Sequence, residues 1–173
     1  MRALYSKGNQ LMTNNVTLII EWQGPYTLEE LKEDSDWGDG LYIATGKLKN
    51  KQTEEIQYCG ITEGGFFYRL SNHHKINEIT RNQRFWIGDI VYPKRPSRDH
   101  MELAESIIIY FWQPTLNERK KVSPPKPITI IGHWLKSDGS PRFRQHPLCK
   151  DFDDVLSWDG KLWRTGNLSV WED

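Results

Sequence analysis

Short runs in which apolar and polar residues alternate recur along the chain, separated by residues that favour turns. Alternation with a period of two is typical of strands, and these runs are rich in β-branched and aromatic residues. Gly-Pro-Tyr at 24–26 predicts a turn after the first run, and Asp159-Gly160 between apolar segments of the tail predicts a hairpin. We therefore expect strands at 16–22, 40–48, 54–62, 84–93 and 128–135, and a hairpin within 153–171.

Three other segments have the apolar spacing or the end signals of helices. The first, 27–33, has Thr27 as a candidate N-cap and Glu30 three residues later, which is the spacing of a capping box. The second, Gly65–Ile79, is amphipathic. The third, 99–114, is longer and more apolar, and we expect its first residue, Asp99, to cap it and a proline to end it.

The order of these elements predicts an α+β protein with a small, mostly antiparallel sheet flanked by helices. The Lys- and Pro-rich stretch at 120–127 has no periodicity and reads as an extended connector. A β-rich segment follows it, with Trp158, Trp163 and Trp171 expected mainly in the core of a small appended sheet. We expect three parts: an N-terminal arm at 1–15, a core at 16–120 and a C-terminal extension at 121–173, packed on the core.

Length and composition restrict the class of protein. The chain has 173 residues, of which 37% are hydrophobic and 27% charged, as in a globular protein of one domain. No apolar stretch approaches the roughly 18 to 20 residues that span a bilayer, so no membrane partner is expected. The first 15 residues lack the apolar centre of a signal peptide, so we expect a cytoplasmic protein. Cys59 and Cys149 are expected to be reduced thiols.

The net charge is zero, but its distribution is uneven. Between Glu21 and Gly40 there are seven acidic residues and one lysine, whereas between Arg119 and Lys150 there are eight Lys or Arg and one Asp. Such asymmetry predicts one acidic and one basic face. A basic face can attract a polyanion even on a neutral protein, because the local potential governs the approach.

Arg69 and His73 are four residues apart in the second expected helix, so they would lie on one face, one turn apart. Two neighbouring cations repel each other unless an anion lies between them. That anion is either a carboxylate of the chain or a phosphate from outside. His74, one residue further on, is expected to point elsewhere, into solvent.

The polar residues at the edges of these elements occur in a recognisable order. Gly40-Leu41-Tyr42 begins one strand of the expected hairpin, Tyr58-Cys59-Gly60 lies in its partner, and Arg69, Glu105 and Asn117 follow. This set resembles the GIY-YIG nuclease superfamily over about Val16 to Asn117. A histidine four residues after the arginine is typical of its type II restriction-endonuclease branch.

The chain departs from the family pattern at the middle of both tripeptides, where it has Leu41 and Cys59. Side chains alternate across a strand, so both residues are expected to point into the core, opposite the tyrosines. Neither departure touches the expected chemistry.

The resemblance implies a metal-dependent DNA endonuclease with six catalytic residues. Glu105 is the expected ligand of one Mg²⁺ per active site, with Mn²⁺ as a substitute, because Mg²⁺ keeps much of its hydration shell and needs few carboxylates. Arg69 would hold the scissile phosphate. Tyr42 would act as the general base or orient the water, Tyr58 would hydrogen-bond the water or a phosphate oxygen, and the two roles could be exchanged. The implied set is Tyr42, Tyr58, Arg69, His73, Glu105 and Asn117.

His73 would accept a proton from Tyr42 or hydrogen-bond to it. Asn117 would tie a loop near the metal. Each of these residues also has a plainer interpretation: an aromatic of a strand, a surface histidine, a structural asparagine, or a salt bridge from Arg69 to Glu63 or Glu78.

The expected partner is double-stranded DNA, cut at a short specific site. Cutting both strands requires either a two-fold homodimer or two successive nicks. Basic residues in the loops outside the shared core are the candidates for phosphate contact. They are Lys94, Arg95, Arg98, Lys120, Lys121, Arg142 and Arg144.

Three alternatives stay open at this point. One is a mobile-element or repair nuclease of the same superfamily, although the chain has only about fifty residues after the core for a DNA-binding domain. Another is a nucleic-acid-binding protein without catalysis. The third is an interaction module in which the pattern is coincidental.

Overall fold

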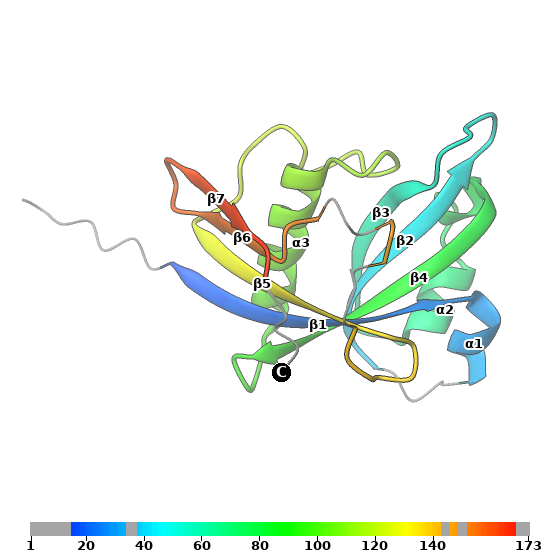
Figure 1. The fold of residues 1–173 in the computed structure, drawn as a ribbon, viewed down its shortest axis with the longest axis horizontal. Coiled ribbons are helices and arrows are strands. Elements are labelled where there is room, and N and C mark those ends of the chain that lie inside the picture. Colours follow the sequence, from blue (N-terminus) through cyan, green and yellow to red (C-terminus); the bar gives the residue numbers. More distant parts are fainter. Residues whose placement is uncertain (1–14, 34–37, 143–145, 149–151, 169–173) are drawn as a thin grey trace, which may run out of the picture.

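The structure is a computed structural model that describes residues 15–33, 38–142, 146–148 and 152–168. A single twisted sheet of seven strands forms its centre, in the order β3-β2-β4-β1-β5-β6-β7. All neighbouring strands are antiparallel except β1 and β5, which run parallel (Figure 1). The strands are β1 (Val16–Tyr26), β2 (Gly40–Leu48), β3 (Glu55–Thr62), β4 (Ile79–Tyr92), β5 (Ile128–Leu135), β6 (Val155–Trp158) and β7 (Trp163–Gly166).

The described helices are α1 (Leu28–Glu33), α2 (Phe66–Ser71), a short 3-10 helix (Ile76–Glu78) and α3 (Arg98–Trp112). The expected α+β class is therefore confirmed, with sheet as the larger part. None of these helices is long and apolar enough to cross a membrane.

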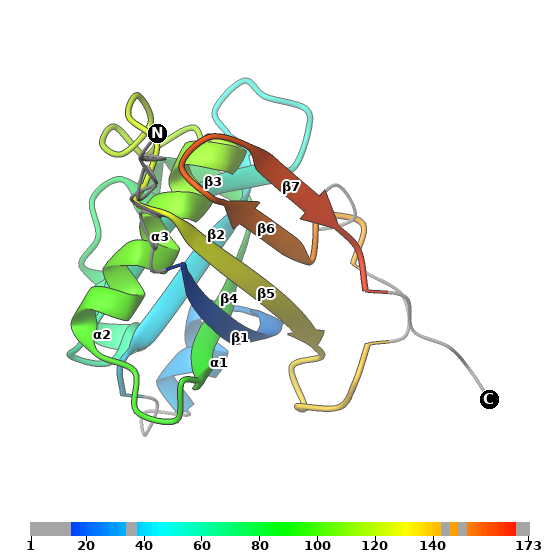
Figure 2. The same ribbon diagram turned by 90° about the vertical axis from the view of Figure 1, so that its left-hand side faces the viewer.

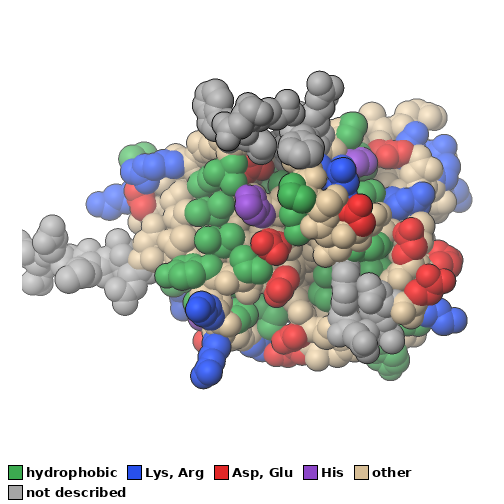
Figure 3. Space-filling model, turned by 60° about the horizontal axis from the view of Figure 1, so that its bottom comes forward, with side chains coloured by type: hydrophobic (Ala, Val, Ile, Leu, Met, Phe, Trp, Pro, Cys, Tyr) green, Lys and Arg blue, Asp and Glu red, His purple; other side chains and the backbone are tan. Residues whose placement is uncertain are grey.

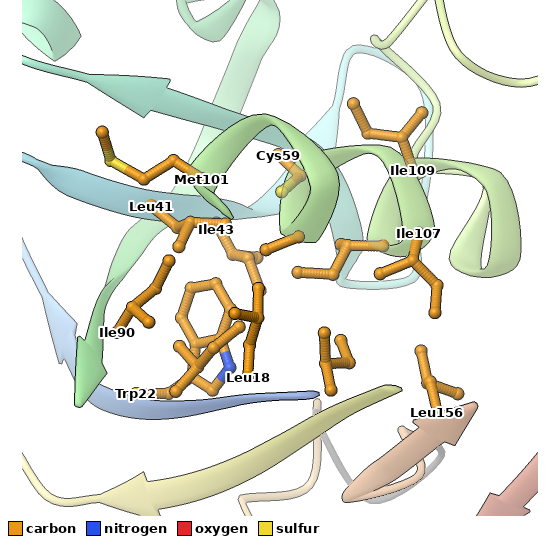
Figure 4. Packing of buried hydrophobic residues seen from close by; sticks show 14 of the residues in the cluster. Leu18, Trp22, Leu41, Ile43, Cys59, Ile90, Met101, Ile107, Ile109 and Leu156 are labelled. Carbon is orange, nitrogen blue, oxygen red and sulfur yellow. The ribbon is translucent and has the colours of Figure 1, made fainter. Parts of the chain in front are cut away.

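The sheet has a hydrophobic core on each face. On one face α3 packs on β1, β2 and β5, and Leu41, Ile43 and Cys59 point toward it (Figure 4). On the other face Tyr42 and Ala44 pack with Phe66 of α2 and with α1. Leu41 and Cys59 thus lie opposite the tyrosine side, as expected from strand alternation.

The expected hairpin and the first capping box are both confirmed. β2 and β3 pair antiparallel, with Tyr42 opposite Gly60. The backbone N–H of Thr27 donates to Oε2 of Glu30 at 2.6 Å, and the N–H of Glu30 donates to Oγ1 of Thr27 at 3.2 Å. Two of the N–H groups at the start of α1 are therefore satisfied locally.

The expected single helix Gly65–Ile79 is wrong. α2 ends at Ser71, because the side-chain amide of Asn72 donates to the carbonyl of Tyr68 at 2.9 Å and competes with the helical pattern. The chain then turns, and β4 begins already at Ile79. Arg69 and His73 therefore do not share a helix face, since His73 lies in the turn.

Two other boundaries differ from the expectation. β1 continues to Tyr26 instead of turning at 24, and the β1–β4 register shifts between Gln23 and Tyr26. Gly24 allows close approach of the two strands there, because a Cβ atom would lie 2.8 Å from the carbonyl oxygen of Phe85. α3 is capped by Ser97 rather than Asp99.

The C-terminal strands extend the main sheet and do not form a separate one. β5 lies beside β1, and β6 and β7 follow at the far edge (Figures 1 and 2). Trp158 and Trp163 stack on each other with centroids 4.7 Å apart, and Trp163 also stacks on Tyr110 of α3. The sheet thus runs across the expected boundary at 120 without interruption.

Candidate active site

A cavity of about 580 Å³ lies at the free edge of β3. The helices α2 and α3, which pack on opposite faces of the sheet, both contribute to it, as does the segment after α3. The edge position leaves the cavity open to a ligand larger than itself. Its lining residues are Tyr58, Arg69, Asn72, His73, His74, Lys75, Glu105, Ile109, Asn117, Glu118, Arg119 and Lys120.

The two tyrosines come from neighbouring strands and lie on one face. Their rings stack with centroids 6.0 Å apart and an interplanar angle of 17°. Gly60 makes this possible, because a Cβ atom there would lie 2.5 Å from the hydroxyl of Tyr42. Tyr58 is partly exposed and lines the cavity, whereas Tyr42 is fully buried behind it.

Both hydroxyls are held in the protonated form. Burial raises the pKa of Tyr42 well above its usual range, with the neighbouring Tyr58 as a smaller cause. Burial and the nearby Glu105 carboxylate raise the pKa of Tyr58. The Tyr42 hydroxyl has no hydrogen bond of good geometry, although it interacts electrostatically with the guanidinium of Arg69. A cation placed near either oxygen would lower its pKa.

Arg69 lies in the last turn of α2, with its side chain exposed to the cavity. Within the described residues its guanidinium forms no salt bridge, and Glu63, a candidate partner, pairs with Arg98 instead. Tyr42, Tyr58 and Glu105 all interact with its charge. The guanidinium is therefore available to an external anion.

His73 is buried, with 5% of its surface exposed, and its ring meets the edge of the Tyr58 ring with centroids 4.6 Å apart. Burial and then the charge of Arg69 lower the pKa of His73 to about 4. The imidazole is neutral at neutral pH, so it can accept a proton or a hydrogen bond. Its Nδ1 is buried without a hydrogen-bond partner.

Glu105 projects from α3 into the cavity, with 14% of its side chain exposed. Oε2 of the carboxylate pairs with Nζ of Lys120. The described residues contain no group of three or more His, Cys, Asp or Glu side chains that could hold a metal ion. One carboxylate beside a cavity with room for water fits Mg²⁺, which keeps several water ligands, better than a metal that needs a full set of protein ligands.

Asn117 has a structural role in this arrangement. Its Nδ2 donates to the carbonyl of Cys59 at 2.8 Å, and its Oδ1 accepts from the N–H of Cys59 at 2.9 Å. Cys59 is in the edge strand β3, so the amide takes the place of a neighbouring strand. Asn117 therefore fixes the segment after α3 against the strand that carries Tyr58.

Several residues of the cavity have no place in the expected set. They are Asn72, His74, Lys75, Ile109, Glu118 and Arg119. Lys75 pairs with Glu118 at 2.6 Å, which joins the turn after α2 to the segment after α3. His74 is exposed as expected, but it does not point elsewhere: it lines the cavity and stacks on His73 with centroids 5.7 Å apart. The signal for the polar ones among them was their closeness in sequence to His73 and Asn117.

The candidate DNA contacts fall into different environments. Lys94 and Arg95 are exposed in the loop before α3, and Lys121 is half-buried after Lys120, which lies in the cavity. Arg98 pairs with Glu63 and Glu102.

Arg142 is held by the fold, because its guanidinium lies 5.2 Å above the Trp86 ring and Nη2 donates to the carbonyl of Gly24 at 2.8 Å. We therefore do not count it as a free phosphate ligand. Arg144 lies outside the described residues, as do Cys149, expected to be a reduced thiol, and Trp171, expected in the core.

Acidic side chains gather on another part of the surface. On the face in Figure 3 several of them lie through the middle, and others lie toward the right-hand margin beside lysine and arginine. A second cavity, of about 410 Å³, has Glu21, Asp39 and Asp89 in its lining. The first cavity instead combines Arg69, Lys75, Arg119 and Lys120 with Glu105 and Glu118, so the separation into an acidic and a basic face stays a prediction.

No protein-family model, no curated protein and no solved structure matches this chain. The side chains of the first cavity are therefore the basis on which a function is inferred.

Proposed function

We propose that this protein is a Mg²⁺-dependent endonuclease of the GIY-YIG type that hydrolyses phosphodiester bonds in double-stranded DNA. The observation that carries the proposal is the convergence of Tyr58, Arg69, His73 and Glu105 on one cavity, with Tyr42 directly behind them. These residues come from two strands, two helices and a turn, so their meeting depends on the fold and not on sequence proximity.

Arg69 binds the scissile phosphate through its planar set of donors, and the lack of a salt bridge to its guanidinium among the described residues supports this role. Arg119, which also lines the cavity, adds positive charge around the same phosphate, whereas the charge of Lys75 is balanced by Glu118. Glu105 would hold the Mg²⁺, which supplies positive charge to the phosphate and its leaving oxygen when bound.

Tyr58 is the hydroxyl with direct access to the cavity, so it orients the attacking water. When Arg69 moves onto the phosphate, its guanidinium no longer interacts with the Tyr42 hydroxyl. Tyr42 can then take part in the reaction. His73, neutral at pH 7, accepts the proton or the hydrogen bond of Tyr58, since the two rings are in contact. The roles of the two tyrosines are thus assigned by exposure, and Tyr58 takes the one nearer the water.

Cleavage of a supercoiled plasmid tests the proposal. The wild-type protein is assayed with Mg²⁺ and with EDTA, beside Glu105→Gln. The matched control is Glu102→Gln, because Glu102 lies one turn earlier on α3, pairs with Arg98 and does not line the cavity. We expect cleavage in Mg²⁺ only, a loss of at least about a hundredfold in Glu105→Gln because the metal ligand is gone, and wild-type cleavage in Glu102→Gln.

Discrete bands would establish a specific site, as expected for a type II restriction enzyme, and smearing would indicate a nuclease with little sequence preference. DNA binding in EDTA by both the wild type and Glu105→Gln, without cleavage under any condition, would replace the proposal with a non-catalytic DNA-binding function. Absence of DNA binding at low salt, where phosphate contacts are strongest, would reject both.

A further inference from the structure

The Glu105 carboxylate, the expected metal ligand, already has a cation of the chain on it. Nζ of Lys120 contacts Oε2, and within the described residues it is the only cation that forms an ion pair with Glu105. A carboxylate with 14% of its side chain exposed is costly to leave without a counter-ion. Lys120 therefore neutralises the charge of the Glu105 carboxylate when no metal is present.

The backbone of Lys120 also bears on the design of a test. Its φ is +65°, a left-handed conformation that residues with a side chain rarely adopt. Glycine fits that backbone without strain, so the side chain of Lys120 can be removed there without a cost from the backbone conformation. Nζ has one further contact, the carbonyl oxygen of Glu102 at 3.5 Å.

We propose that Lys120 is a positioning residue that exchanges places with the metal: it holds the Glu105 carboxylate in the free protein and moves onto the DNA phosphate when the divalent cation binds. This inference rests on the proposed function. Two cations on one carboxylate repel each other, so an arriving ion drives the ammonium away. The displaced ammonium remains in the cavity with Arg69, where the other carboxylate, Glu118, already pairs with Lys75, so an incoming phosphate is the anion that receives it.

One consequence is that the metal and DNA help each other to bind. When a phosphate receives the ammonium, displacement of Lys120 by the metal ion costs no free energy. Without DNA, the displaced ammonium loses its counter-ion, and this cost weakens metal binding. By linkage, the metal must then strengthen DNA binding by the same factor. The exchange also prevents a firmly bound metal from persisting in the DNA-free protein.

The first experiment is a Mn²⁺ titration of the DNA-free protein, followed by electron paramagnetic resonance. Lys120→Met removes the ammonium and keeps most of the side-chain length, and Lys120→Gly removes the side chain and suits the left-handed backbone. We expect both variants to bind Mn²⁺ about tenfold more tightly than the wild type, because a unit charge beside the ion has been removed. Lys126→Met, which removes an exposed lysine from the connector, should bind like the wild type, and Glu105→Gln should lose the site.

The second experiment measures affinity for a short DNA duplex in Ca²⁺ and in EDTA. If Lys120 moves to the phosphate only when a metal is present, Lys120→Met weakens DNA binding in Ca²⁺ by several-fold and leaves it unchanged in EDTA. A lysine with a purely structural role would change both conditions alike.

Equal or weaker Mn²⁺ binding by both Lys120 variants would overturn the exchange, even if the wild type cuts DNA. Failure of the proposed function has a different signature, since the wild type would then not cut DNA, whether or not it binds DNA and whatever the Mn²⁺ affinities. Absence of a Mn²⁺ site in the wild type and in both Lys120 variants would reject the exchange and the metal-dependent reaction together.

Discussion

His73 illustrates how a single buried residue links stability to the site. Its imidazole packs between the rings of Tyr58 and His74, and the charge of Arg69 acts on it. Burial alone disfavours its protonated form, and the neighbouring cations add to that effect. As a result, the native state takes up a proton at His73 less readily than the unfolded chain does.

This difference predicts an acid sensitivity that belongs to His73. The pKa of about 4 in the native state lies below the ordinary histidine pKa of 6.5, so the unfolded state binds more protons between those limits. The stabilisation is therefore complete above pH 6.5 and is lost as the pH falls toward 4, at a total of about 3 kcal/mol. Chemical denaturation of the wild type and of His73→Gln over this pH range measures it.

The variant should show a smaller loss of unfolding free energy than the wild type over the same range. His133→Gln, a substitution of an exposed histidine on β5, controls for removal of a histidine and should follow the wild-type profile. Coincident profiles for the wild type and His73→Gln would contradict the assignment.

At the scale of the elements, the register of β2 against β3 builds the tyrosine pair. Tyr42 lies opposite Gly60, so its ring crosses β3 where no side chain stands. Both tyrosines thereby reach the same face of the sheet. The third residue of Tyr58-Cys59-Gly60 is thus required by packing against the first tripeptide, not by the flexibility of glycine.

Gly60→Ala tests this reading of the hairpin. The added methyl group would lie 2.5 Å from the Tyr42 hydroxyl and 2.9 Å from a ring carbon of Tyr58, so one of the rings must move. We expect a loss of about 1 to 3 kcal/mol in unfolding free energy, as for overpacked cores, together with a strong loss of cleavage. Gly64→Ala is the matched control, because no atom lies within 4 Å of its Cβ position. Wild-type melting and cleavage by Gly60→Ala would show that the pair is not held by this contact.

The hairpin could be predicted because its strands carry local signals: alternation, a polar turn and a second strand of similar length. The second helix could not, because its apolar residues continue past Ser71 while the backbone turns. Ile76 and Ile79 are buried in the same core as Leu70, so the spacing of apolar residues predicts one helix. Ile76 instead begins the short 3-10 helix, and Ile79 begins β4. The contact between His73 and Tyr58 therefore arises from the tertiary fold and could not be predicted from the periodicity of apolar residues.

At the scale of the whole molecule, the parallel pairing of β1 with β5 is the feature that local signals do not contain. Both strands are short apolar runs, and nothing in either one specifies a partner 112 positions away, as Val16 and Ile128 are. The connector at 120–127 separates the two parts in sequence but not in space. Ile128, Ile130, Trp134 and Leu156 complete the core under α3.

This continuity predicts that residues 1–120 do not fold alone. Removal of 121–173 would leave β1 as an open edge and expose the core residues that β5 and β6 now cover. We expect the free energy lost with this buried apolar surface to exceed the free energy of unfolding of an ordinary domain. A fragment of residues 1–120 should give poorly dispersed NMR spectra and no cooperative melting. A chain of residues 1–168, which keeps every described strand, should melt in one transition. Cooperative melting of the shorter fragment would instead show that the core at 16–120 folds without the extension at 121–173. The strands β5 to β7 would then not be needed for folding, which would favour a role for them in DNA binding.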